Sequence, residues 1–190
     1  KWANAGNLLK RNISLVDLYK IEEFWDISLN ESSGEGLLAR DVDDLPINFY
    51  RLPKLAKLFL TPKSLESLGS GIGLIQSLRV LGVRGCGSIP PEIGRLSSLE
   101  NIKFSHGSVE DIPVELAELG KLRSLELNHN RISFVPNFIG GMTSLWTLDL
   151  SCNRIDSLPD SIIADNAIKD LLLEDNQLYE LPRFPKKLGR

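Results

Sequence analysis

The chain has few of the residues that crosslink or chelate, with two cysteines and two histidines among its 190 residues. Two cysteines cannot supply a disulfide framework, so the fold must depend on a packed core, and we expect a reducing compartment. The one methionine is internal, at position 142, and the chain begins with Lys1. A targeting segment is therefore neither indicated nor excluded. Two Asn-x-Ser sequons, at Asn12 and Asn30, keep a secreted location as the alternative.

The sequence also lacks a strong charge bias and a long apolar run. It has 22 basic and 25 acidic residues, a formal net charge of -3 and a pI of about 5.5, which gives no indication of nucleic-acid binding. No apolar run reaches the roughly 18 residues that cross a bilayer. A composition of 42% hydrophobic and 25% charged residues is ordinary for a globular domain with a real core. We expect a cytoplasmic protein without membrane insertion or a nucleic-acid partner.

What the sequence has in abundance is an internal repeat. The segment LRSLELNHNRISFVP, from Leu122, aligns with LWTLDLSCNRIDSLP, from Leu145, at an offset of 23 residues. Seven copies follow the pattern L-x-x-L-x-L-x-x-N-x-L-x-x-L-P, in which we number positions from the first leucine. The copies begin at Phe24, Leu55, Leu78, Leu99, Leu122, Leu145 and Ile168. Apolar residues at positions 1, 4 and 6 alternate with polar ones, which predicts a short strand in each copy.

This pattern resembles the leucine-rich repeat family over roughly residues 18–182. The segments PPEIGRLSSL and VPNFIGGMTSL are similar to the 23-residue intracellular class of Ras-group and Ras-suppressor-like proteins. LRVLGVRGCGSIPPEIGRLSSLENI is similar to the repeats of plant-type nucleotide-binding immune receptors. The resemblance implies an α/β repeat solenoid of about seven repeats, with a parallel sheet on the concave face and loops, 3₁₀ turns or short helices on the convex face. Residues 1–23 are expected to form a cap and a partial repeat, and residues 24–190 the repeat domain.

Two positions of the repeat carry polar residues with a predictable role. Position 9 is asparagine in the last three copies (Asn130, Asn153 and Asn176). We expect each amide to hydrogen-bond the turn backbone of its own repeat and the next. The earlier copies lack this asparagine, so the N-terminal half should be less regular.

Position 8 carries His106, His129, Cys152 and Asp175, which are both metal-ligand types and the members of a Cys-His-Asp nucleophile set. Side chains on four successive strands span about 14 Å at about 4.8 Å per strand. A zinc ion holds its ligands at about 2.0–2.3 Å. We therefore interpret these residues as solvated turn residues. The sequence predicts no enzyme, no catalytic or metal-binding residue, no cofactor and no small-molecule substrate. Cys86 and Cys152 lie three repeats apart and are expected to be free thiols.

The candidate site is the concave face, built by positions 2, 3, 5 and 7. Its predicted partner-binding residues are Trp25, Lys57, Phe59, Arg79, Arg84, Lys103, Glu126, Trp146, Asp149, Asp170, Leu172 and Glu174. The cations fall in repeats 2 to 4 and the carboxylates in repeats 5 to 7, so opposite patches can orient a partner. Exposed aromatic residues are favoured anchors at such interfaces. The alternative for Trp146 is that it packs on its neighbours Arg123 or Lys169.

These features predict a non-enzymatic module that binds another protein along the concave face, and the resemblance implies a scaffold or regulator of a signalling complex. One alternative is a structural subunit of a large assembly. Another is the recognition segment of a longer nucleotide-binding immune-type receptor. An insertion in the first copy, SSGEGLLARDVDD, contains Leu37 and Leu38. These two leucines either dock a neighbouring protein or fold back on the edge strand.

Overall fold

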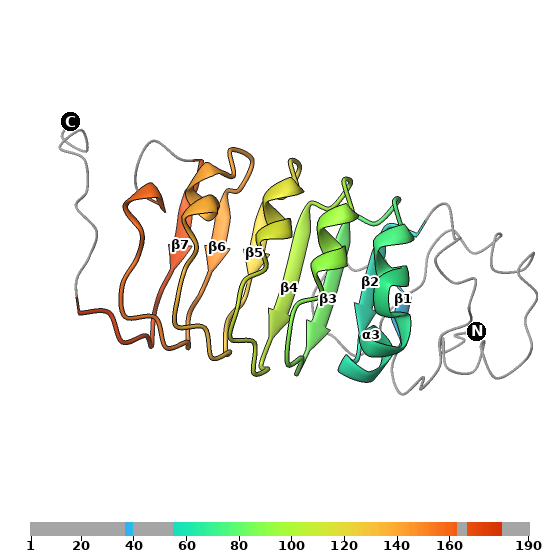
Figure 1. Ribbon diagram of the computed structural model, residues 1–190, viewed down its shortest axis with the longest axis horizontal. Helices are drawn as coiled ribbons and strands as arrows, with labels where there is room; N and C mark the ends of the chain where they lie inside the picture. Colours follow the sequence, from blue (N-terminus) through green and yellow to red (C-terminus); the bar gives the residue numbers. More distant parts are fainter. Residues whose placement is uncertain (1–36, 40–54, 163–166, 180–190) are drawn as a thin grey trace, which may run out of the picture.

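The computed structural model of the chain describes residues 37–39, 55–162 and 167–179. These residues form a parallel sheet whose seven strands follow one another in sequence order. Figure 1 shows the strands side by side along an elongated stack. The strands are β1 (Leu37–Ala39), β2 (Lys57–Leu60), β3 (Val80–Arg84), β4 (Asn101–Ser105), β5 (Ser124–Glu126), β6 (Thr147–Asp149) and β7 (Asp170–Leu172).

A second layer of short helical segments connects consecutive strands (Figure 1). One is an α-helix, α3 (Pro62–Leu68), and the others are 3₁₀ helices. They are η2 (Gly69–Leu74), η3 (Pro91–Arg95), η4 (Val114–Glu118), η5 (Asn137–Gly141) and η6 (Asp160–Ile162). A proline in extended backbone precedes η3, η4 and η5, where its missing N–H leaves no bond unmade. The predicted convex segments are therefore confirmed.

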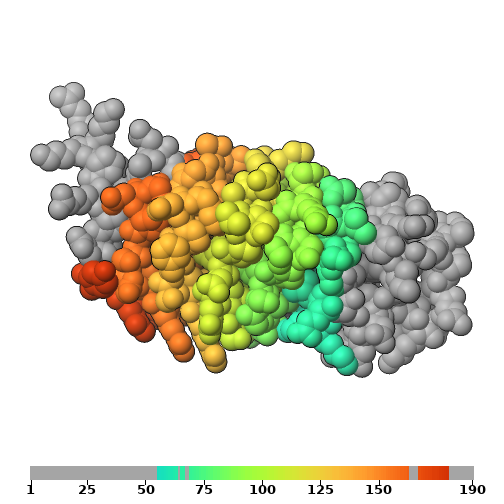
Figure 2. Space-filling model, viewed as in Figure 1, coloured from blue at the N-terminus to red at the C-terminus, as the bar shows by residue number. Residues whose placement is uncertain are grey.

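The core lies between the two layers and is built from the predicted repeat positions. In the repeat that begins at Leu145, positions 1, 4 and 6 (Leu145, Leu148 and Leu150) are fully buried. The convex segments add one or more apolar residues each, such as Ile93 and Ile139. Burial of each such side chain stabilises the fold by about 1.5–3 kcal/mol. Successive repeats pack as slabs side by side (Figure 2), so each repeat completes the core of its neighbours.

The first strand differs from the sequence-based expectation. Numbering from Phe24 places Leu37 and Leu38 in an insertion, yet β1 pairs in parallel with β2 and sets Leu37 opposite Leu58. Of the two alternatives, folding back onto the edge strand is the one that the structure shows. The interval from Leu37 to Leu58 is 21 residues, equal to the interval from Leu81 to Ile102 in the next register but one. Leu37 therefore occupies position 4 of a short repeat, and Phe24 lies outside the described residues.

The position 9 asparagines form a ladder, but in the opposite direction from the one expected. Nδ2 of Asn153 donates to the carbonyls of Leu150, in its own repeat, and Leu127, in the preceding repeat, both at 2.9 Å. Its Oδ1 accepts the N–H of Ile132, also in the preceding repeat, at 3.0 Å. The equivalent bonds are made by Asn130 and Asn176. The prediction of a bond to the next repeat was wrong because the chain leaves each strand toward the repeat before it.

Position 8 carries a backbone feature that the sequence analysis missed. The four non-glycine residues of this position have positive φ angles of 54° to 55°, and Gly85 in the preceding repeat has a φ of 84°. They are His106, His129, Cys152 and Asp175. Left-handed backbone is costly for most residues, and His, Asp and Asn are enriched there. A turn requirement therefore explains the composition of this column.

Repeat length is less regular in the N-terminal half, as predicted. The strand-to-strand intervals at position 4 are 21, 23 and 21 residues up to Ile102 and 23 residues at each later step. Among the described residues, no helix is long and apolar enough to span a membrane.

Candidate protein-binding face

The open face of the sheet, which we define as the surface formed by positions 2, 3, 5 and 7, gathers the predicted site residues. Parallel register stacks equal positions into columns that cross all the strands. The position 5 column runs through Phe59, Gly82, Lys103, Glu126, Asp149 and Leu172. The other predicted residues stand in the columns of positions 2, 3 and 7. Only Trp25 cannot be placed, since it lies outside the described residues.

Two ion pairs tie neighbouring strands together on this face. Arg79 donates to Glu100 at 2.6 Å, and Lys103 lies 3.0 Å from Glu126. Exposed pairs of this kind contribute at most about 1 kcal/mol. Glu100 was missed as a site residue because the sequence analysis sorted charges by repeat and left out the position 2 column. That column alternates in sign, since Arg123 and Lys169 also belong to it.

Trp146 is stacked between two cations of the same column. The guanidinium of Arg123 lies 5.5 Å from the ring centroid and Nζ of Lys169 lies 4.4 Å from it. This confirms the alternative in which Trp146 packs on its neighbours, and each contact is a cation–π interaction. The side chain still exposes 45% of its surface, so its ring edge faces solvent while both flanks are covered.

Phe59 lies flat across the neighbouring strand. A Cβ built on Gly82 would stand 2.4 Å from Cδ1 of Phe59, so the absence of a side chain at Gly82 makes room for the ring. Phe59 is half-buried as a result. The sequence could have shown this pairing, since both residues occupy position 5 of adjacent repeats.

The charges of the open face and its position 8 rim divide into two halves of opposite sign. The basic half, on β2 to β4, has four cations and one carboxylate, a formal charge of +3. Its members are Lys57, Arg79, Arg84, Lys103 and Glu100. The acidic half, on β5 to β7, has five carboxylates and two cations, a formal charge of -3. Its members are Glu126, Asp149, Asp170, Glu174, Asp175, Arg123 and Lys169.

The position 8 column senses this division. The rings of His106 and His129 are stacked with centroids 4.3 Å apart. Desolvation lowers the pKa of His106, and the nearby charges of Arg84, His129 and Lys103 lower it further. Further along the column, Sγ of Cys152 donates to Oδ2 of Asp175 at 3.5 Å.

Both thiols are held in the protonated form. Desolvation, followed by the hydrogen bond and charge of Asp175, raises the pKa of Cys152. Burial raises the pKa of Cys86, whose Sγ donates to the Ser88 carbonyl at 2.8 Å. A nucleophilic cysteine needs the opposite shift. Both cysteines are free, and within the described residues no group of three or more histidine, cysteine, aspartate or glutamate side chains is placed to hold a metal ion.

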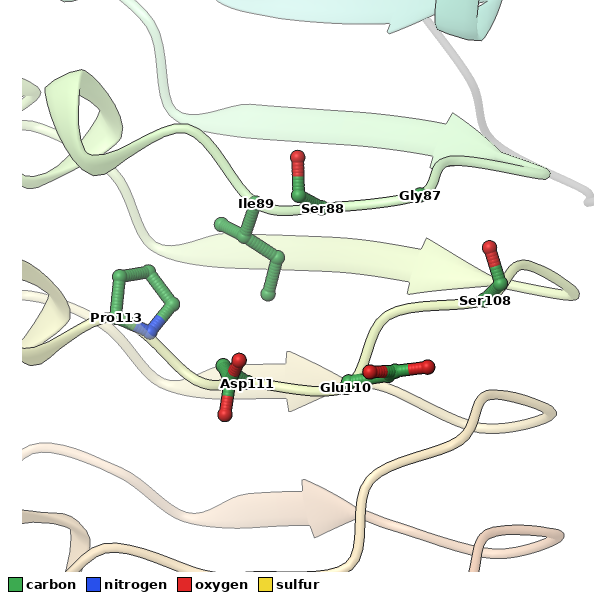
Figure 3. Close-up of a pocket in the computed structure, with 7 residues that line it drawn as sticks. All are labelled: Gly87, Ser88, Ile89, Ser108, Glu110, Asp111 and Pro113. Carbon is green, nitrogen blue, oxygen red and sulfur yellow. The ribbon is translucent and has the colours of Figure 1, made fainter.

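A hollow of about 400 Å³ lies on the flank between the third and fourth repeats (Figure 3). It is lined by Gly87, Ser88, Ile89, Ser108, Glu110, Asp111 and Pro113. The third repeat is two residues shorter here, so its flanking segment does not cover that of the fourth. Figure 3 shows the Glu110 and Asp111 carboxylates at its edge, and both side chains are exposed. The hollow follows from the short repeat and is shallow and polar, unlike an enclosed ligand pocket.

Comparison with known proteins agrees with this geometry. The profile of a pair of leucine-rich repeats matches residues 121–164. Among solved structures, an internalin from Listeria monocytogenes is similar, with a TM-score of 0.56 and 21% identity, and the match covers 68% of this chain and 37% of the internalin. A leucine-rich-repeat protein of Leptospira interrogans gives a TM-score of 0.54 and 21% identity over 89% of this chain and 54% of that protein.

A plant ice-binding protein gives a TM-score of 0.53 and 28% identity, and the match covers 57% of this chain and 37% of that protein. No curated protein matches the chain by sequence. The chain thus spans about a third to a half of the length of the solved structures that it matches.

Proposed function

Since the chain belongs to the leucine-rich-repeat family, whose members generally act as protein–protein interaction modules, we propose that it binds another protein along the open face of its sheet. In this proposal the protein is a scaffold or regulator of a signalling complex and acts in the cytoplasm, without chemistry of its own. The chain contributes a rigid, pre-arranged surface.

The observation that carries the proposal is the placement of the charges. Parallel register puts the basic half and the acidic half on one continuous surface, with a formal charge of +3 on one and -3 on the other. Opposite patches accelerate association with a complementary partner and fix its orientation. Leu172 and Trp146 remain exposed among these charges, at 36% and 45%, and supply apolar contact area.

The alternatives use other surfaces. A structural subunit of a large assembly would be held through both ends of the stack rather than through the open face. A recognition segment of an immune-type receptor would use the open face but belong to a longer chain with a nucleotide-binding domain. The full-length reading frame separates these two from the proposal.

The experiment is a triple charge reversal, Arg79→Glu, Arg84→Glu and Lys103→Glu, measured against a partner recovered from the native source. We expect an affinity loss of at least about tenfold, with a reduced salt dependence. The matched control reverses convex charges, Glu115→Lys and Glu118→Lys on η4, and should leave the affinity unchanged. An unchanged affinity in the triple variant, with its fold intact by circular dichroism, contradicts the proposal.

A further inference from the structure

The open face has a pattern that becomes clear when it is placed opposite a copy of itself. A two-fold axis parallel to the strands, between β4 and β5, sets β2 against β7, β3 against β6 and β4 against β5. Each repeat position then faces the same position on the opposing strand, because rotation about this axis keeps height along the strand. The contacts of such a pair follow from the observed register alone.

The facing residues are complementary in charge. Position 3 sets Lys57 against Asp170, and position 5 sets Lys103 against Glu126. Position 2, which the ion pairs within the chain had made look mixed, sets Glu100 against Arg123 of the second copy. Among the twelve facing pairs of positions 2, 3, 5 and 7 on these described strands, none brings like charges together.

The apolar residues of the face also meet. Phe59 on β2 faces Leu172 on β7, and Arg79 on β3 faces the aromatic ring of Trp146 on β6. Two concave walls touch first at their ends, which is where the Phe59–Leu172 and Lys57–Asp170 pairs lie. The other face-to-face arrangement, with an axis perpendicular to the strands, sets the basic half against the basic half and is excluded by repulsion.

From this pattern we infer that the partner which the open face fits is a second copy of this chain, in a two-fold, face-to-face dimer with β2 opposite β7. The inference rests on the proposed function in that it uses the same surface, and it adds a form of regulation, because the dimer covers the face that a different protein would need. Self-complementarity of one patch is what a two-fold interface requires.

The size of the face predicts a weak and reversible dimer. Six strands at about 4.8 Å spacing and about six residues of height give on the order of 500 Å² per copy. This is below the area of a standard stable interface, so the dissociation constant should lie in the micromolar range or above. Lys103 and Glu126 already pair within the chain, and Lys57 also has an interaction of its own. The intermolecular pairs therefore extend existing networks and should be sensitive to salt.

The test uses sedimentation velocity of the 190-residue chain from about 10 to 500 µM. We expect a monomer–dimer equilibrium at about 50 mM salt that shifts at least about tenfold toward monomer at about 500 mM. Two variants separate the halves. Lys57→Glu with Arg84→Glu makes the face wholly acidic, and Asp170→Lys with Glu174→Lys makes the acidic half basic. Each variant alone should be monomeric, and an equimolar mixture of the two should restore the dimer.

Three results decide the outcome. A wild-type chain that stays monomeric to about 500 µM in low salt overturns the inference, as does a mixture of folded variants that fails to associate. The convex control, Glu115→Lys with Glu118→Lys, should dimerise like the wild type, and a loss there would place the interface elsewhere. Binding of a different protein by the open face of a monomeric wild type would leave the proposed function standing while the dimer failed.

Discussion

Oδ1 of Asn153 accepts the backbone N–H of Ile132, 21 residues earlier, at 3.0 Å, and both residues are buried. The bond closes the turn of one repeat with the side chain of the following repeat. Because the same amide also donates to the carbonyls of Leu127 and Leu150, it links two turns that have no water to replace it. We regard this link as the main polar constraint that sets the stacking of consecutive repeats.

The first prediction follows from this bond. Asn153→Ala leaves a buried N–H and two buried carbonyls without the amide, and should lower the free energy of unfolding by about 2–4 kcal/mol. Asn176→Ala removes an equivalent but half-buried amide and should cost clearly less, since water can reach the freed groups. Urea denaturation of the two variants measures the difference. Equal losses would contradict the assigned role of burial.

Two adjacent glycines of η5 give the second prediction. A Cβ on Gly140 would lie 2.2 Å from the carbonyl oxygen of Ser161 in the next repeat, whereas a Cβ on Gly141 meets nothing within 4 Å. Gly140→Ala should force η5 away from η6 and destabilise the protein by about 1–3 kcal/mol. Gly141→Ala should be neutral or stabilising by up to about 1 kcal/mol. A thermal-shift assay on both variants is sufficient, and the reverse order of stability would refute the packing.

The left-handed backbone at Cys152 gives the third prediction. Its φ is 55°, which β-branched residues adopt only with strain, so Cys152→Val should cost about 1–3 kcal/mol. Cys152→Gly loses the same contact with Asp175 but relieves the backbone, and should be neutral or gain up to about 1 kcal/mol. Chemical denaturation of the pair isolates the backbone term. A valine variant as stable as the glycine variant would argue against it.

The fourth prediction concerns pH. The pKa of His106 in the folded chain is lowered by desolvation and by Arg84, His129 and Lys103, so the unfolded chain takes up this proton at a higher pH. The contribution of the neutral imidazole is therefore present above about pH 6.5 and is lost as the pH falls below that value. We expect unfolding midpoints in urea to fall from pH 7.5 to pH 5. His106→Asn, which tolerates the left-handed turn, should show a smaller fall, and an equal fall would exclude His106 as the cause.

Most of the fold follows from the leucines. Positions 1, 4 and 6 alternate in burial with the other strand positions in the same way from Leu55 to Leu150, and that pattern requires neighbours on both sides, which only a stack provides. The pattern failed at the first copy because Phe24, Ile27 and Leu29 imitate it, while the strand that pairs with β2 begins at Leu37. Local patterns cannot decide between two apolar triplets when strand pairing determines the register.

The site was also predictable in part. Strand alternation is enough to place Lys57, Phe59 and Trp146 on the open face. The direction of the asparagine bonds was not predictable, because it depends on where the chain turns after the strand. The left-handed column could have been inferred from Gly85, which shares its position with His106 and Asp175, residues that tolerate positive φ.

The binding surface can be tested most directly by photocrosslinking from the folded protein. A benzophenone amino acid placed at Asn101 on the open face, or at Glu118 on the convex face, reports which polypeptide lies within reach in an extract of the native source. Both positions are exposed, so neither substitution disturbs the core. The account predicts crosslinked protein from Asn101 and little from Glu118. Crosslinking from Glu118 alone would contradict the open face as the binding surface.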